Sequence, residues 1–125
     1  MKNCIFCKIA KGETSAEVIY KDDKFIAFKD VNPKAPIHFL IIPKKHIPSV
    51  NHLKTRDKKL IGELFLVAQK IARKQGVAKS GYKLVFNVGK GGGQLINHLH
   101  LHLLGGWTSP THHPTIKERD IPGMP

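Results

Sequence analysis

The sequence predicts one α+β domain built around an antiparallel sheet. Short segments of strand character are separated mostly by turn signals, and one long amphipathic segment lies among them. The length of 125 residues suits a single domain, and a hydrophobic content of 41% agrees with a globular chain that buries a core. This composition argues against an overall disordered chain.

The first half of the chain is expected to supply a short helix and three strands. Residues 4–10 fit one helical turn. Residues 17–21 and 25–31 have the character of two short strands, joined by an Asp-Asp turn signal. After the stiff loop NPKAP, the mostly apolar residues 37–43 predict a strand that is covered on both faces.

The second half is expected to supply the one long helix and two further strands. Over residues 57–75 apolar side chains recur at helical spacing, and Gly76 stands just past the end. Residues 82–88 alternate as a strand, the glycine-rich segment 89–93 forms a loop, and 97–104 form another strand. The last twenty residues contain four prolines and predict an extended arm that packs on another surface.

Charge and patterning limit the functions that are possible. The formal charge of +12 indicates an anionic partner but does not distinguish nucleotide, nucleic acid and lipid. Between residues 44 and 79 there are ten basic and two acidic residues, which fits either a solvated helix or a working electrostatic patch. No apolar run is long enough for a membrane-spanning helix, and the first residues lack a signal-peptide pattern. We therefore expect no membrane partner and a cytoplasmic location.

The segment 97–104, Asn-His-Leu-His-Leu-His-Leu-Leu, carries the strongest functional signal. In a strand, His98, His100 and His102 share one face and line a surface or cleft, while the leucines between them are buried. All three cannot bind one metal ion, because positions i and i+4 of a strand lie about 13 Å apart. The row is better suited to an elongated anion. The glycines before it can direct backbone N–H groups toward phosphate oxygens.

Histidine suits chemistry at such an anion. Neutral imidazole is a nucleophile near neutral pH, and its attack on phosphorus gives a phosphorus–nitrogen intermediate that water can cleave. A neighbouring imidazolium can protonate the leaving group or bind charge on the phosphoryl oxygens. One strand would therefore present both a nucleophile and its helper.

This segment resembles the His-φ-His-φ-His-φ-φ signature of the histidine triad (HIT) superfamily. The segment IFCKIAKGE and residues 25–47, 81–89 and 92–106 together resemble its Hint branch, the purine nucleoside phosphoramidate hydrolases. The resemblance implies a HIT fold: a five-stranded antiparallel sheet with one long helix and a short N-terminal helix, continued across a homodimer. It assigns residues 1–106 to the HIT domain and 107–125 to a C-terminal arm that packs on the dimer.

The resemblance also implies hydrolysis of a nucleoside 5'-phosphoramidate, or of an aminoacyl nucleotide, through a covalent nucleotidyl-histidine. His100 would be the nucleophile, His102 would bind the phosphate and assist the leaving group, and His98 would orient His100 through its backbone carbonyl. His38 would be a fourth histidine close to the triad. The implied contacts to the purine nucleotide are Ile5, Phe6, Phe28 and Val31 at the base, Lys29 in the base and ribose pocket, Asp30 at the ribose, and Asn87, Gly93 and Gln94 around the phosphate.

Cys4 and Cys7 form a C-x-x-C pair. By itself this pair fits half a metal site, a redox pair or two incidental thiols, because a disulfide framework is not expected in a reducing compartment. A structural zinc site needs four ligands. Some HIT proteins complete such a site with the histidine of a Pro-x-x-His block and the first triad histidine, which correspond here to His46 and His98. The resemblance therefore implies a structural zinc ion on Cys4, Cys7, His46 and His98, with no metal required for catalysis.

Three departures from the Hint pattern leave other functions open. Leu95 stands where Hint proteins usually carry a serine that touches the phosphate, Lys29 stands where His or Leu is frequent, and the chain after Gly106 is longer than in the short Hint proteins. The alternatives are a dinucleoside polyphosphate hydrolase, a regulatory nucleotide-binding protein, and a nucleic-acid-binding protein. The last is not favoured, because HIT proteins that repair DNA ends carry a zinc finger and this chain lacks the cysteines for one.

Overall fold

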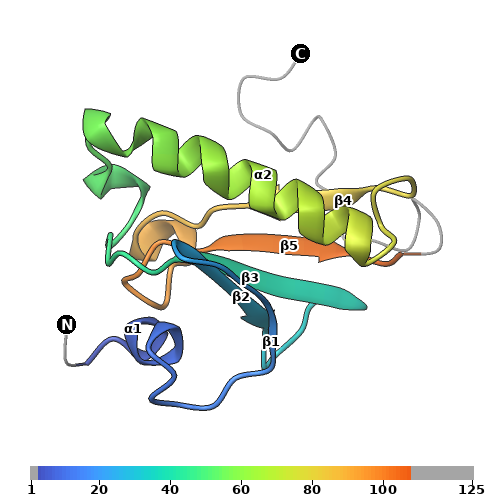
Figure 1. Ribbon diagram of the computed structural model, residues 1–125, viewed down its shortest axis with the longest axis horizontal. Coiled ribbons are helices and arrows are strands. Elements are labelled where there is room, and N and C mark those ends of the chain that lie inside the picture. Colours follow the sequence, from blue (N-terminus) through green and yellow to red (C-terminus); the bar gives the residue numbers. More distant parts are fainter. Residues whose placement is uncertain (1–2, 108–125) are drawn as a thin grey trace.

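The computed structural model, which describes residues 3–107, is built on a five-stranded antiparallel sheet (Figure 1). The spatial order of the strands is β1-β2-β3-β5-β4, so β1 and β4 form the edges. The predicted fold class is confirmed; the expected C-terminal arm lies, apart from Trp107, outside the described residues. The strands are β1 (Val18–Lys21), β2 (Phe25–Lys29), β3 (Ile37–Pro43), β4 (Tyr82–Val85) and β5 (Leu101–Gly105).

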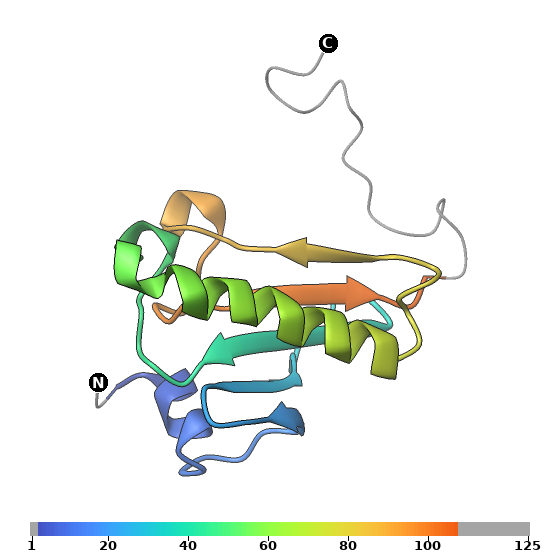
Figure 2. The ribbon, with the colours of Figure 1, turned by 45° about the horizontal axis from the view of Figure 1, so that its top comes forward.

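One helix covers each face of the sheet. The long helix α2 (Lys58–Lys74) crosses one face, and the short helix α1 (Ile5–Ala10) packs on the other (Figures 1 and 2). Strand alternation divides the core accordingly. In β3, Phe39 and Ile41 join the core under α2, whereas Leu40 and Ile42 join the core under α1. This division explains why β3 is apolar along almost its whole length.

The long helix is positioned at both ends. Near its start, the buried carboxylate of Asp57 accepts a hydrogen bond from the Lys45 ammonium and another from the Lys54 backbone N–H, each at 2.8 Å. Just beyond its end, Gly76 adopts a φ of 76°, which suits glycine and ends the helix. Neither α1 nor α2, the α-helices of the described residues, is long and apolar enough to cross a membrane.

The predicted strand 97–104 is wrong at its start, because β5 begins only at Leu101. In the register of β3 with β5, Ile41 faces Leu101, so Pro43 would face Leu99. Proline has no N–H to donate to a neighbouring strand. The carbonyl of Pro43 is bonded instead to the side chain of His98. The chain therefore joins the sheet after both His98 and His100, so that of the three histidines only His102 lies on a strand.

Two other strands are shorter than predicted. β2 ends at Lys29 and not at residue 31, and β4 ends at Val85 and not at residue 88. The last pair of β2 is Lys29 with Phe39 of β3, and the last pair of β4 is Val85 with His102 of β5. After these pairs β2 and β4 each continue into a loop. The strand-like sequence pattern extends beyond these last pairs, which is why both strands were predicted too long.

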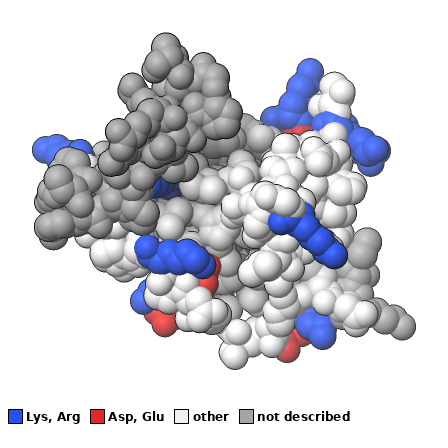
Figure 3. Space-filling view, turned by 180° about the vertical axis from the view of Figure 1, so that it is seen from behind, with Lys and Arg blue, Asp and Glu red and all other residues white. Residues whose placement is uncertain are grey.

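Basic side chains do not gather on the face seen in Figure 3. On that face the described lysines and arginines lie mostly singly among uncharged side chains, and several lie beside an acidic one. Among the described ion pairs, the ammonium of Lys29 pairs with the carboxylate of Glu17. The described basic side chains therefore do not form a continuous patch on this face.

Candidate active site and metal cluster

Four histidines meet on the α1 face of the sheet. His102 lies on β5 opposite Leu40, and His38 lies on β3. The ring centroids of His38 and His102 lie 5.2 Å apart, and those of His100 and His102 lie 5.0 Å apart. His98 departs from the prediction, because it is fully buried rather than lining a cleft. The leucines between the histidines are buried, as expected.

The ring of His100 is oriented by the backbone. Its Nδ1 lies 2.6 Å from the carbonyl oxygen of His98. Because a carbonyl oxygen only accepts hydrogen bonds, Nδ1 must carry the proton, and the neutral ring keeps a lone pair on Nε2. Burial lowers the pKa of His100 below its ordinary value. His100 is therefore suited to act as a neutral nucleophile through Nε2.

His38 and His102 form a second chain of hydrogen bonds. The backbone N–H of Lys34 donates to Nδ1 of His38 at 3.1 Å, so the neutral ring carries its proton on Nε2. That Nε2–H donates in turn to Nδ1 of His102 at 2.9 Å, so His102 carries its own proton on Nε2. Burial lowers the pKa of His102 to about 4. His102 is then neutral near pH 7 and offers an N–H donor.

Asp30 completes this group without making it a metal site. Its Oδ2 lies 3.4 Å from Nε2 of His38, and one ligand atom from each of Asp30, His38 and His102 lies within 4.8 Å of the others. A metal ion on Nε2 of His38 would move the ring proton to Nδ1, where it would face the N–H of Lys34. The donor set therefore fits a hydrogen-bonded chain better than a cation.

Cys4, Cys7, His46 and His98, which we call the metal cluster, have the opposite arrangement. The Nε2–H of His98 donates to the Pro43 carbonyl at 2.8 Å, which leaves the Nδ1 lone pair of the neutral ring free. That Nδ1 lies 3.3 Å from Sγ of Cys4 and 3.5 Å from Sγ of Cys7, and Nδ1 of His46 lies 3.2 Å from Sγ of Cys7. All four ligand atoms lie within 4.8 Å of one another. Zinc ligands at 2.0–2.3 Å in a tetrahedron are about 3.5 Å apart, so the cluster fits zinc.

The residues expected around the phosphate have different roles in the structure. Gly93 has a φ of 85°, and the Asn87 amide next to it donates to the Gly92 carbonyl at 2.9 Å. Gln94 is buried, and its amide is fully used within the loop. It accepts from Gly89 N–H at 2.9 Å and donates to the carbonyls of Pro48 at 2.7 Å and Ile96 at 2.9 Å. Gln94 therefore shapes the loop from inside, with no free amide group to offer a ligand.

The residues expected around the purine are only partly brought together. Phe6 and Phe28 pack edge to face with ring centroids 5.4 Å apart, and Phe6 lies 5.1 Å from the ring of His100. Ile5 is partly exposed beside them on α1. Val31 is 90% exposed, and Lys29 pairs with Glu17. The structure therefore places Phe6 and Phe28 in the core under α1 and leaves Ile5 and Val31 exposed.

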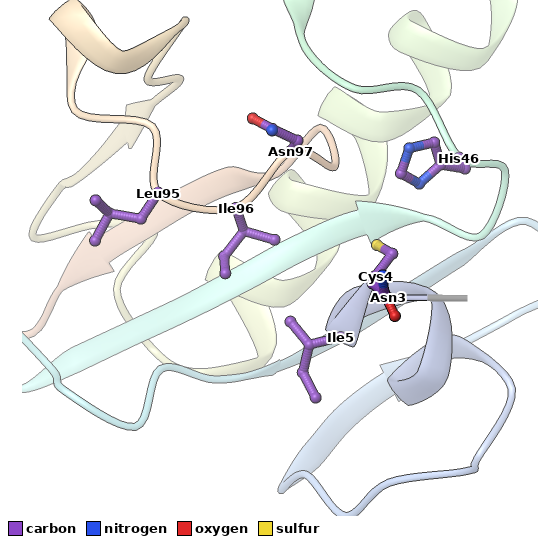
Figure 4. A pocket seen from close by; sticks show the side chains of 7 residues that line it. All are labelled: Asn3, Cys4, Ile5, His46, Leu95, Ile96 and Asn97. Carbon is purple, nitrogen blue, oxygen red and sulfur yellow. The ribbon is translucent and has the colours of Figure 1, made fainter. Parts of the chain in front are cut away.

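The sequence did not indicate two backbone groups and one cavity. The Lys34 N–H and the Pro43 carbonyl set the protons of His38 and His98, and backbone groups leave no signal in the residue pattern. A cavity of about 460 Å³ opens beside the metal cluster (Figure 4). Its lining residues are Asn3, Cys4, Ile5, His46, Leu95, Ile96 and Asn97.

Comparison with known proteins agrees with this geometry. Residues 3–113 match the family model described as "Scavenger mRNA decapping enzyme C-term binding". The chain is 46% identical to Protein HitA of Neisseria gonorrhoeae over 105 residues, which cover 84% of this chain and 97% of that protein. It is 44% identical to the purine nucleoside phosphoramidase of Escherichia coli (strain K12) over 102 residues, which cover 82% of this chain and 86% of that enzyme. The chain belongs to the histidine triad family.

The structural comparison leads to the same family. The crystal structure of a HIT family hydrolase from Legionella pneumophila Philadelphia 1 superposes with a TM-score of 0.83 at 50% sequence identity. The match covers 84% of this chain and 94% of that one. The expected HIT resemblance is therefore confirmed, and the chain is a HIT hydrolase.

Proposed function

We propose that this HIT hydrolase cleaves purine nucleoside 5'-phosphoramidates to the nucleoside monophosphate through a nucleotidyl intermediate on His100. The observation that carries the proposal is the 2.6 Å bond between Nδ1 of His100 and the His98 carbonyl, because it leaves Nε2 unprotonated. The similarity to an enzyme named purine nucleoside phosphoramidase supports the choice of substrate.

In the first half-reaction, the Nε2 lone pair of His100 attacks phosphorus and forms a nitrogen–phosphorus bond. The bond from phosphorus to the leaving nitrogen breaks, and its electron pair stays on that nitrogen. If the nitrogen is protonated in the bound substrate, the product leaves as a neutral amine. The hydrogen bond from Nδ1–H to the His98 carbonyl stabilises the positive charge that forms on His100.

His102 is proposed to act as a hydrogen-bond donor. Its Nδ1 already accepts from His38, so a second ring proton would bring two N–H groups face to face. The low pKa of His102, about 4, agrees with a neutral ring at pH 7. The Nε2–H of His102 would therefore bind a phosphoryl oxygen or the leaving nitrogen without being given up.

In the second half-reaction, water attacks phosphorus on the intermediate. The bond between phosphorus and Nε2 of His100 breaks, and its electron pair returns to the ring as the lone pair. One proton of the water passes to solvent as the nucleoside monophosphate forms. His100 is then neutral again, with its proton still on Nδ1.

Two alternatives have less support. A more highly charged dinucleoside polyphosphate would be favoured by a free cation at Lys29, but that ammonium pairs with Glu17. A nucleic-acid partner would be favoured by a continuous basic patch, and the described residues visible on the face in Figure 3 form none there. Comparing kcat/KM on adenosine 5'-phosphoramidate and on diadenosine polyphosphate separates the two hydrolase functions.

A structural zinc ion on the metal cluster is part of the proposal. Two sulfur and two nitrogen atoms form the donor set, and the Pro43 carbonyl holds His98 with Nδ1 toward the sulfurs. When bound, the ion would link α1, the segment after β3 and the histidine segment by coordination. The steps of the reaction use side chains and backbone groups of the chain together with water, and none is assigned to the ion.

A homodimer through α2 and β4 is also proposed. β4 is an edge strand whose outer side has no partner strand among the described residues. Phe65 and Leu66 on the outer side of α2 are 44% and 59% exposed, and Leu84 on β4 is also exposed. Joining two copies along this edge would continue the sheet and bury these apolar side chains.

Replacement of the nucleophile tests the mechanism. His100→Ala is expected to lower kcat on adenosine 5'-phosphoramidate by a factor on the order of 10⁴ or more, because the covalent step is lost. The control His52→Ala changes an exposed histidine on a different segment and should keep full activity. Near-normal turnover by folded His100→Ala protein would refute the assigned role.

Metal analysis tests the cluster. Full-length protein purified without chelator should contain about one zinc per chain, and Cys4→Ser/Cys7→Ser should contain none and melt at a lower temperature. Asp30→Asn is the matched control, because it alters the other histidine and carboxylate group and should keep the zinc. Zinc lost on Asp30→Asn but kept on the cysteine variant would place the ion elsewhere.

Size-exclusion chromatography with light scattering tests the dimer. The wild-type chain should have twice the chain mass, and Phe65→Glu/Leu66→Lys should have the mass of one chain, because charge cannot be buried at an apolar interface. Val31→Glu, at a more exposed apolar position away from α2 and β4, should remain dimeric. A dimer that survives the double substitution would exclude this surface.

A further inference from the structure

The segment with His98 and His100 lies before the start of β5 and outside its hydrogen-bonded ladder. β5 begins only at Leu101. Before it, the N–H of Leu99 bonds to the carbonyl of Ile47 in another loop at 2.6 Å, and the Leu99 side chain is buried. The position of the His98 carbonyl that orients His100 therefore depends on the contacts of the His98 side chain as well as on Leu99.

The metal cluster holds that side chain. The ring of His98 is fully buried, with Nδ1 against the sulfurs of Cys4 and Cys7 and Nε2–H on the Pro43 carbonyl. Both cysteines belong to the first turn around α1, and Sγ of Cys4 accepts the N–H of Cys7 at 3.3 Å. A helix of six residues is not stable by itself, so α1 is held in place by these tertiary contacts.

A second contact links the cluster to the nucleophile. Phe6 lies between the two cysteines in the sequence, and its ring centroid lies 5.1 Å from that of His100 and 6.0 Å from that of His98. A shift of α1 would therefore move the side chain that packs against the edge of the His100 ring. Cluster and nucleophile share two connections, one through a carbonyl and one through an aromatic ring.

The cluster is accessible from solvent on one side. Cys4 and His46 line the cavity of about 460 Å³, and both side chains are seen at its wall in Figure 4. Cys7 and His98 are buried behind them. Metal ions and small chelators can therefore reach two of the four ligands without unfolding of the domain.

We propose that an ion in the metal cluster positions His100, so that metal occupancy sets the turnover number. The proposal rests on the proposed function. Cys4, Cys7 and His46 are then positioning residues, which act through the His98 carbonyl and through Phe6. An ion with a purely structural role would change the free energy of unfolding and leave the turnover of each folded molecule unchanged.

The test uses the full chain with its metal removed by a chelator and replaced by Co²⁺, whose visible absorption with thiolate ligands measures occupancy. Turnover is measured well below the melting temperature of the metal-free protein, and circular dichroism gives the folded fraction. We expect kcat to rise with occupancy by about tenfold or more and KM to change by less than about threefold.

A ligand that does not touch His100 provides the matched variants. His46→Gln should lose the cobalt absorption and lower kcat to the level of the metal-free protein. His52→Gln replaces an exposed histidine outside the cluster and should keep both. Nuclear magnetic resonance gives a readout independent of activity: the Nδ1–H signal of His100 should be sharp in the loaded protein and exchange-broadened in the metal-free protein.

Folded, metal-free protein with full kcat and an unchanged His100 signal would overturn the proposal. If the loaded wild-type protein turns over no nucleoside phosphoramidate, the proposed function fails. The His100 signal then decides the positioning alone: broadening on metal removal supports it, and no change overturns it. If His46→Gln does not fold, the cobalt titration of the wild-type chain gives the same decision.

Discussion

Three groups of His98 hold three different parts of the molecule together. Its Nε2–H donates to Pro43 at the end of β3, its Nδ1 lies against the cysteine sulfurs next to α1, and its carbonyl accepts Nδ1–H of His100. Burial lowers the pKa of His98 to about 4, so near pH 7 the ring is neutral and carries a proton on one nitrogen. The proton on Nε2 of His98 therefore serves the fold and the metal cluster, and the backbone carbonyl of the same residue serves the nucleophile.

The sheet separates these roles by face. Phe39, Ile41 and Leu101 pack under α2 and give the domain its larger core. The opposite face carries His38 and His102, with α1 and its smaller core beside them. Because side chains alternate along a strand, a catalytic row and a core row occupy alternate residues of the same strands. Chemistry on one face is thereby supported by packing on the other.

Much of this arrangement could be predicted from the sequence, because it depends on side-chain patterns. The long helix, the apolar strand β3 and the leucines between the histidines follow from periodicity. The metal cluster and the triad roles came from the family resemblance, and the structure brings the four cluster residues together. The full burial of the His98 side chain could not be predicted from alternation, because alternation placed it beside His100 and His102 on an open surface.

What the sequence missed depends on backbone groups and on register. The start of β5 is set by Pro43, whose missing N–H and occupied carbonyl end the ladder. The proton position on His38 is set by the Lys34 N–H. The role of Gln94 also depends on three backbone partners that come together only in the folded loop. Proline at position 43 is visible in the sequence, but its register against β5 and the backbone partners of His38 and Gln94 are not.

The central claim is that backbone carbonyls fix opposite ring protons on His98 and His100. Long-range proton–nitrogen correlation spectra of the nitrogen-15-labelled full chain at neutral pH measure this directly. The account predicts a proton on Nε2 and none on Nδ1 for His98, and a proton on Nδ1 and none on Nε2 for His100. A proton on Nε2 of His100 would contradict it, because the proposed nucleophile would then have no lone pair to offer.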